Sequence, residues 1–163
     1  MKGARASSAA RRLGKSAGVQ YAALPYRLGD VVEILLVTSR ETRRWVIPKG
    51  WPMKGLKPHA AAAREAREEA GVMGKVGKTA IGRYTYVKLL KNGAPLDCSV
   101  EVYPLEVTGH LVKWREKGQR TLHWFTIGEA AEAVSEPELQ DLIETFGRTL
   151  TDSAGYASSS MSQ

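Results

Sequence analysis

The chain has 163 residues, a length that suits one domain with a substantial core. Hydrophobic residues make up 43% and charged residues 25%, an ordinary globular balance, and no apolar run approaches the roughly 18 residues of a membrane span. The single cysteine, Cys98, excludes an internal disulfide, and the absence of a Cys/His cluster argues against zinc. We therefore expect a reducing compartment, assigned as the cytoplasm, and no membrane partner.

The formal net charge of +7 is unevenly distributed. The first 18 residues contain no acid and five cations, Lys2, Arg5, Arg11, Arg12 and Lys15. A flexible basic tail can bind polyanions nonspecifically, but a solvated terminus is the favoured interpretation. The same Arg-, Ser- and Ala-rich composition is typical of organelle transit peptides. We predict a flexible basic tail over 1–17, one domain over 18–151, and a disordered Ser-rich tail over 152–163.

The first half of the domain indicates strands followed by one helix. Residues 19–27 and 31–39 have strand character and are separated by a Gly-Asp turn, which predicts a hairpin. A short apolar strand is predicted over 45–47, followed by a loop rich in Gly, Pro and Lys. A helix is predicted over 58–70, because nearly all its residues are good helix formers and Gly71 can end it.

The second half indicates more strands and two helices. Strands are predicted over 79–90 and 96–107, with an Asn-Gly hairpin signal between them, and over 121–125. Thr126 with Glu129 forms a capping box for a short helix. A second capping box and an apolar stripe at helical spacing predict the last helix, from Ser135 and Glu138 through Leu139, Leu142, Ile143, Phe146 and Leu150.

Three carboxylates share one face of the helix predicted over 58–70. Glu65, Glu68 and Glu69 stand at i, i+3 and i+4, and each helical residue turns by about 100°. Like charges at this spacing destabilise a helix, and a divalent cation removes that cost. Carboxylate oxygens are the ligands that Mg²⁺ and Mn²⁺ prefer, so the pattern predicts a Mg²⁺ (or Mn²⁺) site. The alternative is a solvated acidic face paired with neighbouring arginines. A stripe of small residues would let the helix lie close to a sheet: Ala62, Ala66 and Ala70.

A longer pattern surrounds these carboxylates. The elements in register are Gly50, Arg64-Glu65-Ala66, Glu68-Glu69 and Gly71-Val72. In this spacing the chain resembles the Nudix hydrolase family over roughly residues 19–150, and the loop 50–55 is similar to that of diphosphoinositol polyphosphate phosphohydrolases. The resemblance implies an α/β fold, a Nudix-like α/β/α sandwich with a mixed central sheet. It also implies metal-dependent hydrolysis of a diphosphate linkage in a phosphorylated small molecule, such as a dinucleoside polyphosphate, a diphosphoinositol polyphosphate or another nucleoside diphosphate derivative.

The resemblance also assigns roles within the site. Glu65, Glu68 and Glu69 are implied metal ligands, one of which shares the work of a base, and the carbonyl of Gly50 is a further candidate ligand. Cations in such a site polarise phosphoryl oxygens and lower the pKa of bound water. A separate general base is expected from a later loop, and Glu116 is the candidate.

Several cations and one aromatic residue lie within or beside the family pattern that runs from Gly50 to Val72. Arg43, Arg44 and Lys49 are candidates to bind substrate phosphates, with ordinary solvated charge as the alternative. Trp51 is a candidate to stack on a base or to cover the pocket, and equally a candidate packed anchor for its loop. Together with Lys54 and Lys57, these cations predict a preference for densely phosphorylated substrates over nucleotide sugars.

One position departs from the family pattern. Leu56 stands where the family usually has a glutamate, which gives some support to a catalytically silent phosphate-ligand sensor on the same fold. The intact set of Glu65, Glu68 and Glu69 argues against a sensor, because a sensor need not keep every ligand. A third class, a nucleic-acid-binding protein, is motivated only by the basic tail. We expect no nucleic-acid contact beyond nonspecific binding by that tail.

Overall fold

The computed structural model describes residues 17–155, so the predicted basic tail up to residue 16 and the stretch 156–163 lie outside the described residues. Its strands are β1 Ala17–Leu28, β2 Val32–Thr38, β3 Trp45–Val46, β4 Lys49–Gly50, β5 Val72–Val76, β6 Gly82–Leu89, β7 Pro95–His110 and β8 Leu122–Thr126. Its helices are α2 Pro58–Ala70, α3 Ile127–Ala133, α4 Pro137–Leu150 and the π-helical turn η1 Thr151–Gly155. No helix between residues 17 and 155 is long and apolar enough to cross a membrane.

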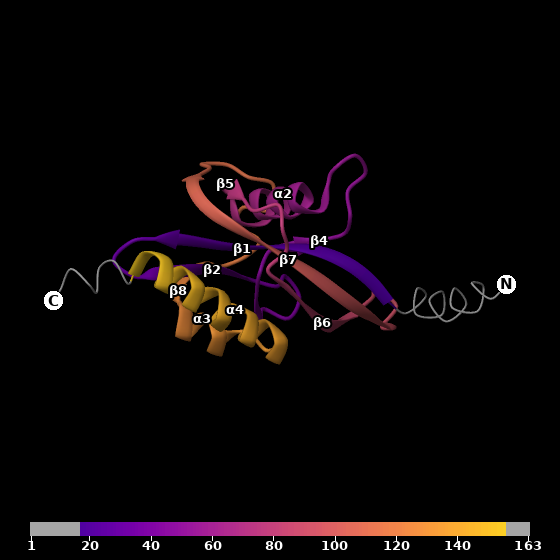
Figure 1. Cartoon of the computed structure of the whole chain (residues 1–163). Coiled ribbons are helices and arrows are strands. Elements are labelled where there is room, and N and C mark those ends of the chain that lie inside the picture. The colour runs from indigo at the N-terminus through magenta and orange to yellow at the C-terminus, as the bar shows by residue number, and fades with distance from the viewer. Residues whose placement is uncertain (1–16, 156–163) are drawn as a thin grey trace.

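All eight strands belong to one mixed sheet. The central strand β1 runs parallel to β7 and antiparallel to β2 and β4, while β5 and β6 pair with β7 and β8 pairs with β2. Both predicted hairpins are confirmed, with Tyr26 opposite Ile34 in one and Leu89 opposite Pro95 in the other. Helix α2 covers one face of the sheet, and α3 and α4 cover the other (Figure 1). The predicted α/β/α arrangement with a mixed sheet is therefore confirmed.

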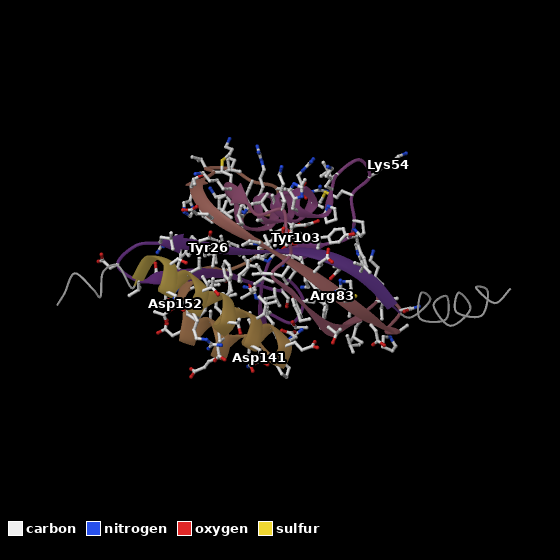
Figure 2. The ribbon with its side chains drawn as sticks, in the orientation of Figure 1. Tyr26, Lys54, Arg83, Tyr103, Asp141 and Asp152 are labelled. Atoms are coloured by element: carbon white, nitrogen blue, oxygen red, sulfur yellow. The ribbon has the colours of Figure 1, made fainter. Side chains whose placement is uncertain are left out.

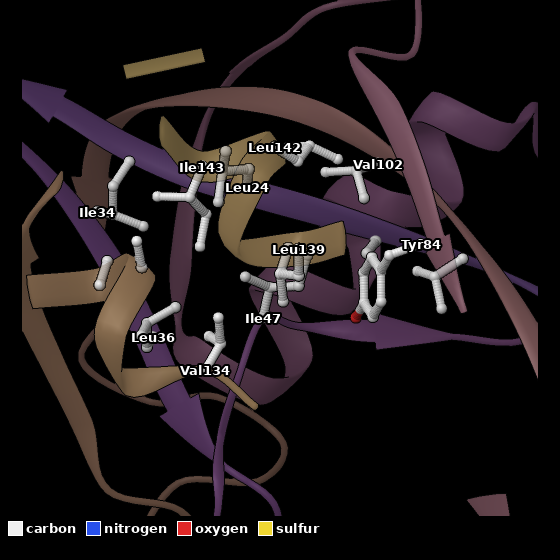
Figure 3. Close-up of a cluster of buried hydrophobic side chains, with 14 residues drawn as sticks. Leu24, Ile34, Leu36, Ile47, Tyr84, Val102, Val134, Leu139, Leu142 and Ile143 are labelled. Atoms are coloured by element: carbon white, nitrogen blue, oxygen red, sulfur yellow. The ribbon is translucent and has the colours of Figure 1, made fainter. Parts of the chain in front are cut away.

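The face covered by α3 and α4 holds the larger apolar core. Leu139 and Ile143 of α4 are fully buried against Leu24 and Ile34 of the sheet (Figure 3). Burying one such side chain contributes about 1.5–3 kcal/mol, so this layer supplies much of the stability of the fold. The predicted apolar stripe of α4 is confirmed as core packing, since Leu142 also joins it and Phe146 packs at its edge.

The face covered by α2 is thinner. Ala62, Ala66 and Ala70 are buried against the sheet, where they meet another small residue, Ala23 of β1. Alanines on both sides let the helix axis approach the strands closely. This close approach brings the glutamates of α2 to the level of the short strand β4.

The structure corrects two of the predicted elements. Strand β5 follows Gly71 directly, in a stretch where no strand was predicted. The burial of its side chains does not alternate cleanly. Among the strands of residues 17–155 it pairs only with β7, so its register depends on a partner far away in sequence. The predicted tail over 152–163 also begins too early, because η1 continues the helical path through Gly155.

The two predicted capping boxes have different outcomes. The box formed by Thr126 and Glu129 is present at the start of α3. The second box is wrong: Glu136 occupies the cap position of α4, and its side chain makes no capping hydrogen bond in the described part of the chain. The carboxylate of Glu138 instead accepts hydrogen bonds from the backbone N–H (2.7 Å) and hydroxyl (3.0 Å) of Thr85 on β6. A tertiary contact has replaced the local one.

Candidate active site

Helix α2 has the predicted bounds and places two of its glutamates against β4. Gly71 ends the helix with a left-handed φ of 68°, and its N–H donates to the carbonyl of Arg67. The backbone N–H of Lys49 donates to Oε1 of Glu69 at 3.3 Å. Gly50 faces the carboxylate of Glu65 so closely that a Cβ there would collide with it. The structure thus brings Gly50, Glu65 and Glu69 together, as the sequence predicted.

These two carboxylates share a poorly solvated space. Burial raises the pKa of Glu65 to about 8, and the charge of Glu69 and a hydrogen bond between the two carboxyl groups contribute further. Burial also raises the pKa of Glu69 to about 6, although Arg120 and Lys49 oppose that rise. Two carboxyl groups within hydrogen-bonding reach need either a proton or a cation between them. The missing side chain of Gly50 leaves room for the Glu65 carboxylate beside β4, and the oxygen donors of the two glutamates fit a hard divalent cation.

Glu68 lies beside this pair and is engaged elsewhere. Its Oε2 is 3.1 Å from Nε of Arg64, and its Oε1 is 3.8 Å from a guanidinium nitrogen of Arg115. Within residues 17–155, no group of three or more His, Cys, Asp or Glu side chains is arranged to hold a metal ion. Of the predicted set of three carboxylates, Glu65 and Glu69 are assembled, and Glu68 would have to leave its ion pairs to join them.

The loop between β7 and β8 brings Glu116 to the same helix. Its backbone N–H donates to the carbonyl of Glu68 at 3.0 Å. Its carboxylate accepts a hydrogen bond of 2.8 Å from Nε of Arg120. Arg120 also lies 3.6 Å from Oε2 of Glu69 and donates to the carbonyl of Thr38 at 3.1 Å. Glu116 is therefore next to the α2 carboxylates, where a general base was expected.

Arg120 is a residue that sequence reasoning missed. Its side chain is only 10% exposed, and it joins α2, the end of β2 and the loop. Nothing in its sequence context distinguishes it from the other cations of a polar loop, because its partners are far away along the chain. Its burial is what separates it from a solvated surface arginine.

Lys49 and Arg44 approach the opposite face of the sheet. Adjacent residues of a strand point to opposite faces, so Lys49 points away from α2 where Gly50 faces it. The Lys49 ammonium lies 4.9 Å from the ring centroid of Tyr86, and burial lowers its pKa. Arg44 forms an ion pair of 3.1 Å with Glu136, which is buried and whose other oxygen, Oε1, lacks a hydrogen-bond partner within the described structure. Arg44 thus lies with Glu136, whereas Lys49 interacts electrostatically with both Glu69 and Glu136.

The structure places Arg43 and Trp51 in supporting contacts. Arg43 is exposed and donates to the carbonyl of Gln119 and to the hydroxyl of Thr121, both at 3.2 Å. Trp51 packs its ring on Gly18 of β1 and is 41% exposed. This contact matches the loop-anchor interpretation of Trp51, and the contacts of Arg43 tie the β2–β3 turn to the loop that carries Arg120.

Leu56, which departs from the family pattern, lies on the outer flank of α2. It lines a shallow groove with Ala60, Ala63 and Met73, beside Arg64. That flank is distinct from the one that presents Glu65 and Glu69 to Gly50. The position is therefore peripheral to the carboxylate pair.

Comparisons with known proteins agree with this arrangement of helices and sheet. A model of the NUDIX domain family matches residues 21–146. The mitochondrial Nudix hydrolase 16 of Arabidopsis thaliana is 34% identical over 126 residues, which are 72% of this chain and 67% of that protein. Human diphosphoinositol polyphosphate phosphohydrolase 3-beta is 34% identical over 116 residues, 69% of this chain and 66% of the human protein. The crystal structure of an Ap4A hydrolase from C. elegans superposes with a TM-score of 0.59 at 22% identity, covering 82% of this chain and 98% of its own.

The fold and the match over residues 21–146 are those of a NUDIX domain. The chain belongs to the Nudix hydrolase family. It spans between 61% and 67% of the length of three Arabidopsis relatives that it matches, so this membership describes the shared domain. The family expectation drawn from the spacing of Gly50, the α2 glutamates and Gly71 is confirmed.

Proposed function

We propose that the protein hydrolyses a diphosphate linkage in a phosphorylated small molecule and needs Mg²⁺ or Mn²⁺ to do so. The observation that carries this proposal is the pair of carboxyl groups of Glu65 and Glu69, which share one desolvated space facing Gly50. A divalent cation stabilises two such carboxyl groups strongly. It takes the place of the proton that they share, and its charge compensates the cost of burying two carboxylates. The match of residues 21–146 to the NUDIX domain family supports the same chemistry.

The chain's own residues have distinct tasks in this reaction. Glu65, Glu69 and the carbonyl of Gly50 would hold the cation, with Glu68 as a further ligand once it leaves Arg64. A bound divalent cation polarises phosphoryl oxygens, lowers the pKa of bound water and neutralises a departing phosphate. Glu116 accepts a proton from the attacking water at its carboxylate, which Arg120 orients by the hydrogen bond of 2.8 Å.

The charge around α2 favours a densely phosphorylated substrate. Lys54 projects from the loop before α2, on the side of the sheet away from Asp141 of α4 (Figure 2). Arg64 and Arg115, which now pair with Glu68, would be released toward phosphates when Glu68 takes part in cation binding. Relatives named diphosphoinositol polyphosphate phosphohydrolases support this substrate class. Dinucleoside polyphosphates and diphosphoinositol polyphosphates are thus preferred to nucleotide sugars.

The test is a hydrolysis assay with a dinucleoside polyphosphate, a diphosphoinositol polyphosphate and a nucleotide sugar, each with Mg²⁺, with Mn²⁺ and with excess chelator. The proposal expects turnover with either metal and none with chelator. It expects the larger kcat/KM for the two dense substrates, with a preference that weakens as salt rises, because exposed charge contacts are screened. A larger kcat/KM for the nucleotide sugar at both low and moderate salt would contradict the substrate proposal.

A second candidate function is a catalytically silent sensor of phosphate ligands. Leu56 in place of the usual glutamate and the engagement of Glu68 in ion pairs both favour it. The same assay decides between the two, since a sensor binds the dinucleoside polyphosphate with Mg²⁺ present and leaves it uncleaved. We rank the sensor second because Glu65 and Glu69 are placed together.

The compartment is a separate proposal. The free Cys98 is buried in β7, in accord with a reducing compartment, and we propose the cytoplasm. The competing location is the mitochondrion, because four Arabidopsis relatives carry that word in their names and residues 1–17 are basic. Fractionation of cells that express the full chain and a variant lacking residues 1–17 decides this. Import that depends on these residues would overturn the cytoplasmic assignment.

A further inference from the structure

The loop from Leu111 to Arg120 carries the candidate base without any helix or strand of its own. Two of its backbone N–H groups donate to carbonyls at the end of α2, from Leu111 to Gly71 at 2.8 Å and from Glu116 to Glu68 at 3.0 Å. The last carbonyls of a helix lack partners within the helix, so the loop satisfies them. The orientation of Glu116 therefore depends on how firmly this loop is docked on the end of α2.

One side chain fills the space between the loop and the helix. The ring of Trp114 packs against Gly71, so closely that a Cβ at Gly71 would collide with it. The ammonium of Lys117 lies over the Trp114 ring, 5.2 Å from its centroid, while donating to the carbonyl of Val112 at 2.6 Å. The indole Nε1 is buried and has no partner within the described structure. A buried donor without a partner is costly, so the ring is held there by packing rather than by a hydrogen bond.

We propose that Trp114 is a positioning residue, which docks the loop on Gly71 and so places Glu116 and Arg120 against the α2 carboxylates. This inference rests on the proposed hydrolysis. Trp114 lies two residues before Glu116 and packs three residues after Glu68, so a tilt of its ring moves the loop relative to the helix end. Gly71 serves the contact twice, since it both adopts the left-handed φ of 68° and leaves room for the indole.

The test compares Trp114→Ala with Trp114→Phe and with a loop control, Val112→Ala, whose parent side chain is 79% exposed. Trp114→Phe keeps an aromatic ring on Gly71 and should keep kcat within about threefold of the parent enzyme. Trp114→Ala should lower kcat by roughly ten- to hundredfold with little change in KM, because small misplacements of catalytic groups have effects of this size. Val112→Ala should leave kcat and KM unchanged.

A double-mutant cycle separates positioning from general stabilisation. If Trp114 acts through Glu116, Trp114→Ala should have little further effect on kcat in a protein that already carries Glu116→Gln. An equal loss of kcat in both backgrounds would overturn the proposal. Should Trp114→Ala fail to fold, Trp114→Leu takes its place in the same cycle, with a smaller expected loss.

Amide hydrogen exchange gives a readout that does not require activity. The N–H groups of Leu111 and Glu116 should exchange faster in Trp114→Ala than in Trp114→Phe, while N–H groups in β1 keep their protection. Unchanged exchange at both loop positions would overturn the docking role even if kcat fell. If the parent protein cleaves no diphosphate substrate, the proposed function fails, and the exchange experiment still decides whether Trp114 docks the loop.

Discussion

The two faces of the sheet differ in what they bury. The α4 face buries large apolar side chains, Leu139 and Ile143 among them, and its outer surface carries acids such as Asp141 (Figure 2). The α2 face has a smaller core, in which alanines of the helix pack on side chains such as Leu35 and Leu105, and it also buries the carboxyl group of Glu69, which is only 6% exposed. The larger apolar core thus lies on one face, and the candidate metal ligands lie on the other. The larger core on the α4 face packs without Glu65 and Glu69. These two carboxyl groups can therefore stay desolvated on the other face.

The largest expected effect is a loss of kcat when a carboxylate on the α2 face is removed. Glu69→Gln keeps the shape of the side chain but removes one charge of the carboxylate pair. We expect kcat to fall at least about a hundredfold, the scale seen when a group that stabilises transition-state charge is removed. Glu144→Gln, the same change on the exposed side of α4, should leave kcat unchanged. Steady-state kinetics with Mg²⁺ on both variants measures this, and equal activity would remove the distinction between the faces.

The next largest effect is a loss of stability when a core side chain on the α4 face is shortened. Leu139→Ala removes a fully buried side chain from the larger core. We expect it to lower the free energy of unfolding by about 2–5 kcal/mol, while kcat per folded molecule stays unchanged. Urea unfolding together with kinetics below the transition measures both. A fall in kcat of the folded protein would show that this core also controls the site.

A smaller loss of stability is expected from overpacking under α2. Ala66→Leu inserts a large side chain between the helix and the sheet, and should cost about 1–3 kcal/mol. Unlike Leu139→Ala, it should also lower kcat, because lifting α2 moves Glu65 away from Gly50. Ala63→Leu on the same helix is the matched control, since Ala63 lines the open groove beside Met73. Equal effects of the two alanine changes on kcat would contradict the claim that the close approach of α2 to the sheet places Glu65 beside Gly50.

The pH dependence of stability should also come from the α2 face. In the unfolded chain Glu65 has its ordinary pKa near 4.5, whereas in the folded protein the pKa is about 8. The folded state therefore binds more protons between these values, and its stability without divalent cation should fall as pH rises from about 5 through about 8. Glu65→Gln should flatten this dependence, as should added Mg²⁺. Thermal unfolding across pH measures it, and a stability that rose through this range would contradict the assignment.

The smallest effect is expected at Leu56. A glutamate there would lie beside Arg64 on the outer flank of α2, and exposed ion pairs contribute about 0–1 kcal/mol. Leu56→Glu should therefore change kcat by less than about threefold. Kinetics on this single variant provide the check. A gain from no activity to robust hydrolysis would show that the natural protein is a sensor.

Much of the fold could be predicted because its signals are local. Helix formers between Pro58 and Gly71 define α2, and turn residues define both hairpins. The second capping box failed because Glu138 has a better partner in Thr85, far away in sequence. The parallel pairing of β1 with β7 has no local signature, because it depends on which strands meet across the folded core.

The site was predictable to the same extent. The spacing of Glu65 and Glu69 along one helix was sufficient to place them together, and the register with Gly50 came from the family pattern. The contacts of Arg120 and Trp114 could not be predicted, because both act through tertiary packing of an irregular loop. The side chain of Lys49 points to the other face because side chains alternate along a strand. This direction could not be predicted, because the sequence did not indicate that β4 is a strand.

The most direct test of the account is an equilibrium Mn²⁺ titration of the substrate-free protein, followed by electron paramagnetic resonance, for the parent chain and for Glu65→Gln combined with Glu69→Gln. The account predicts saturable Mn²⁺ binding by the parent at pH 8 and binding at least about tenfold weaker in the double variant, which loses both paired carboxylates. Equal Mn²⁺ affinity in the two proteins would contradict the claim that Glu65 and Glu69 form the metal site.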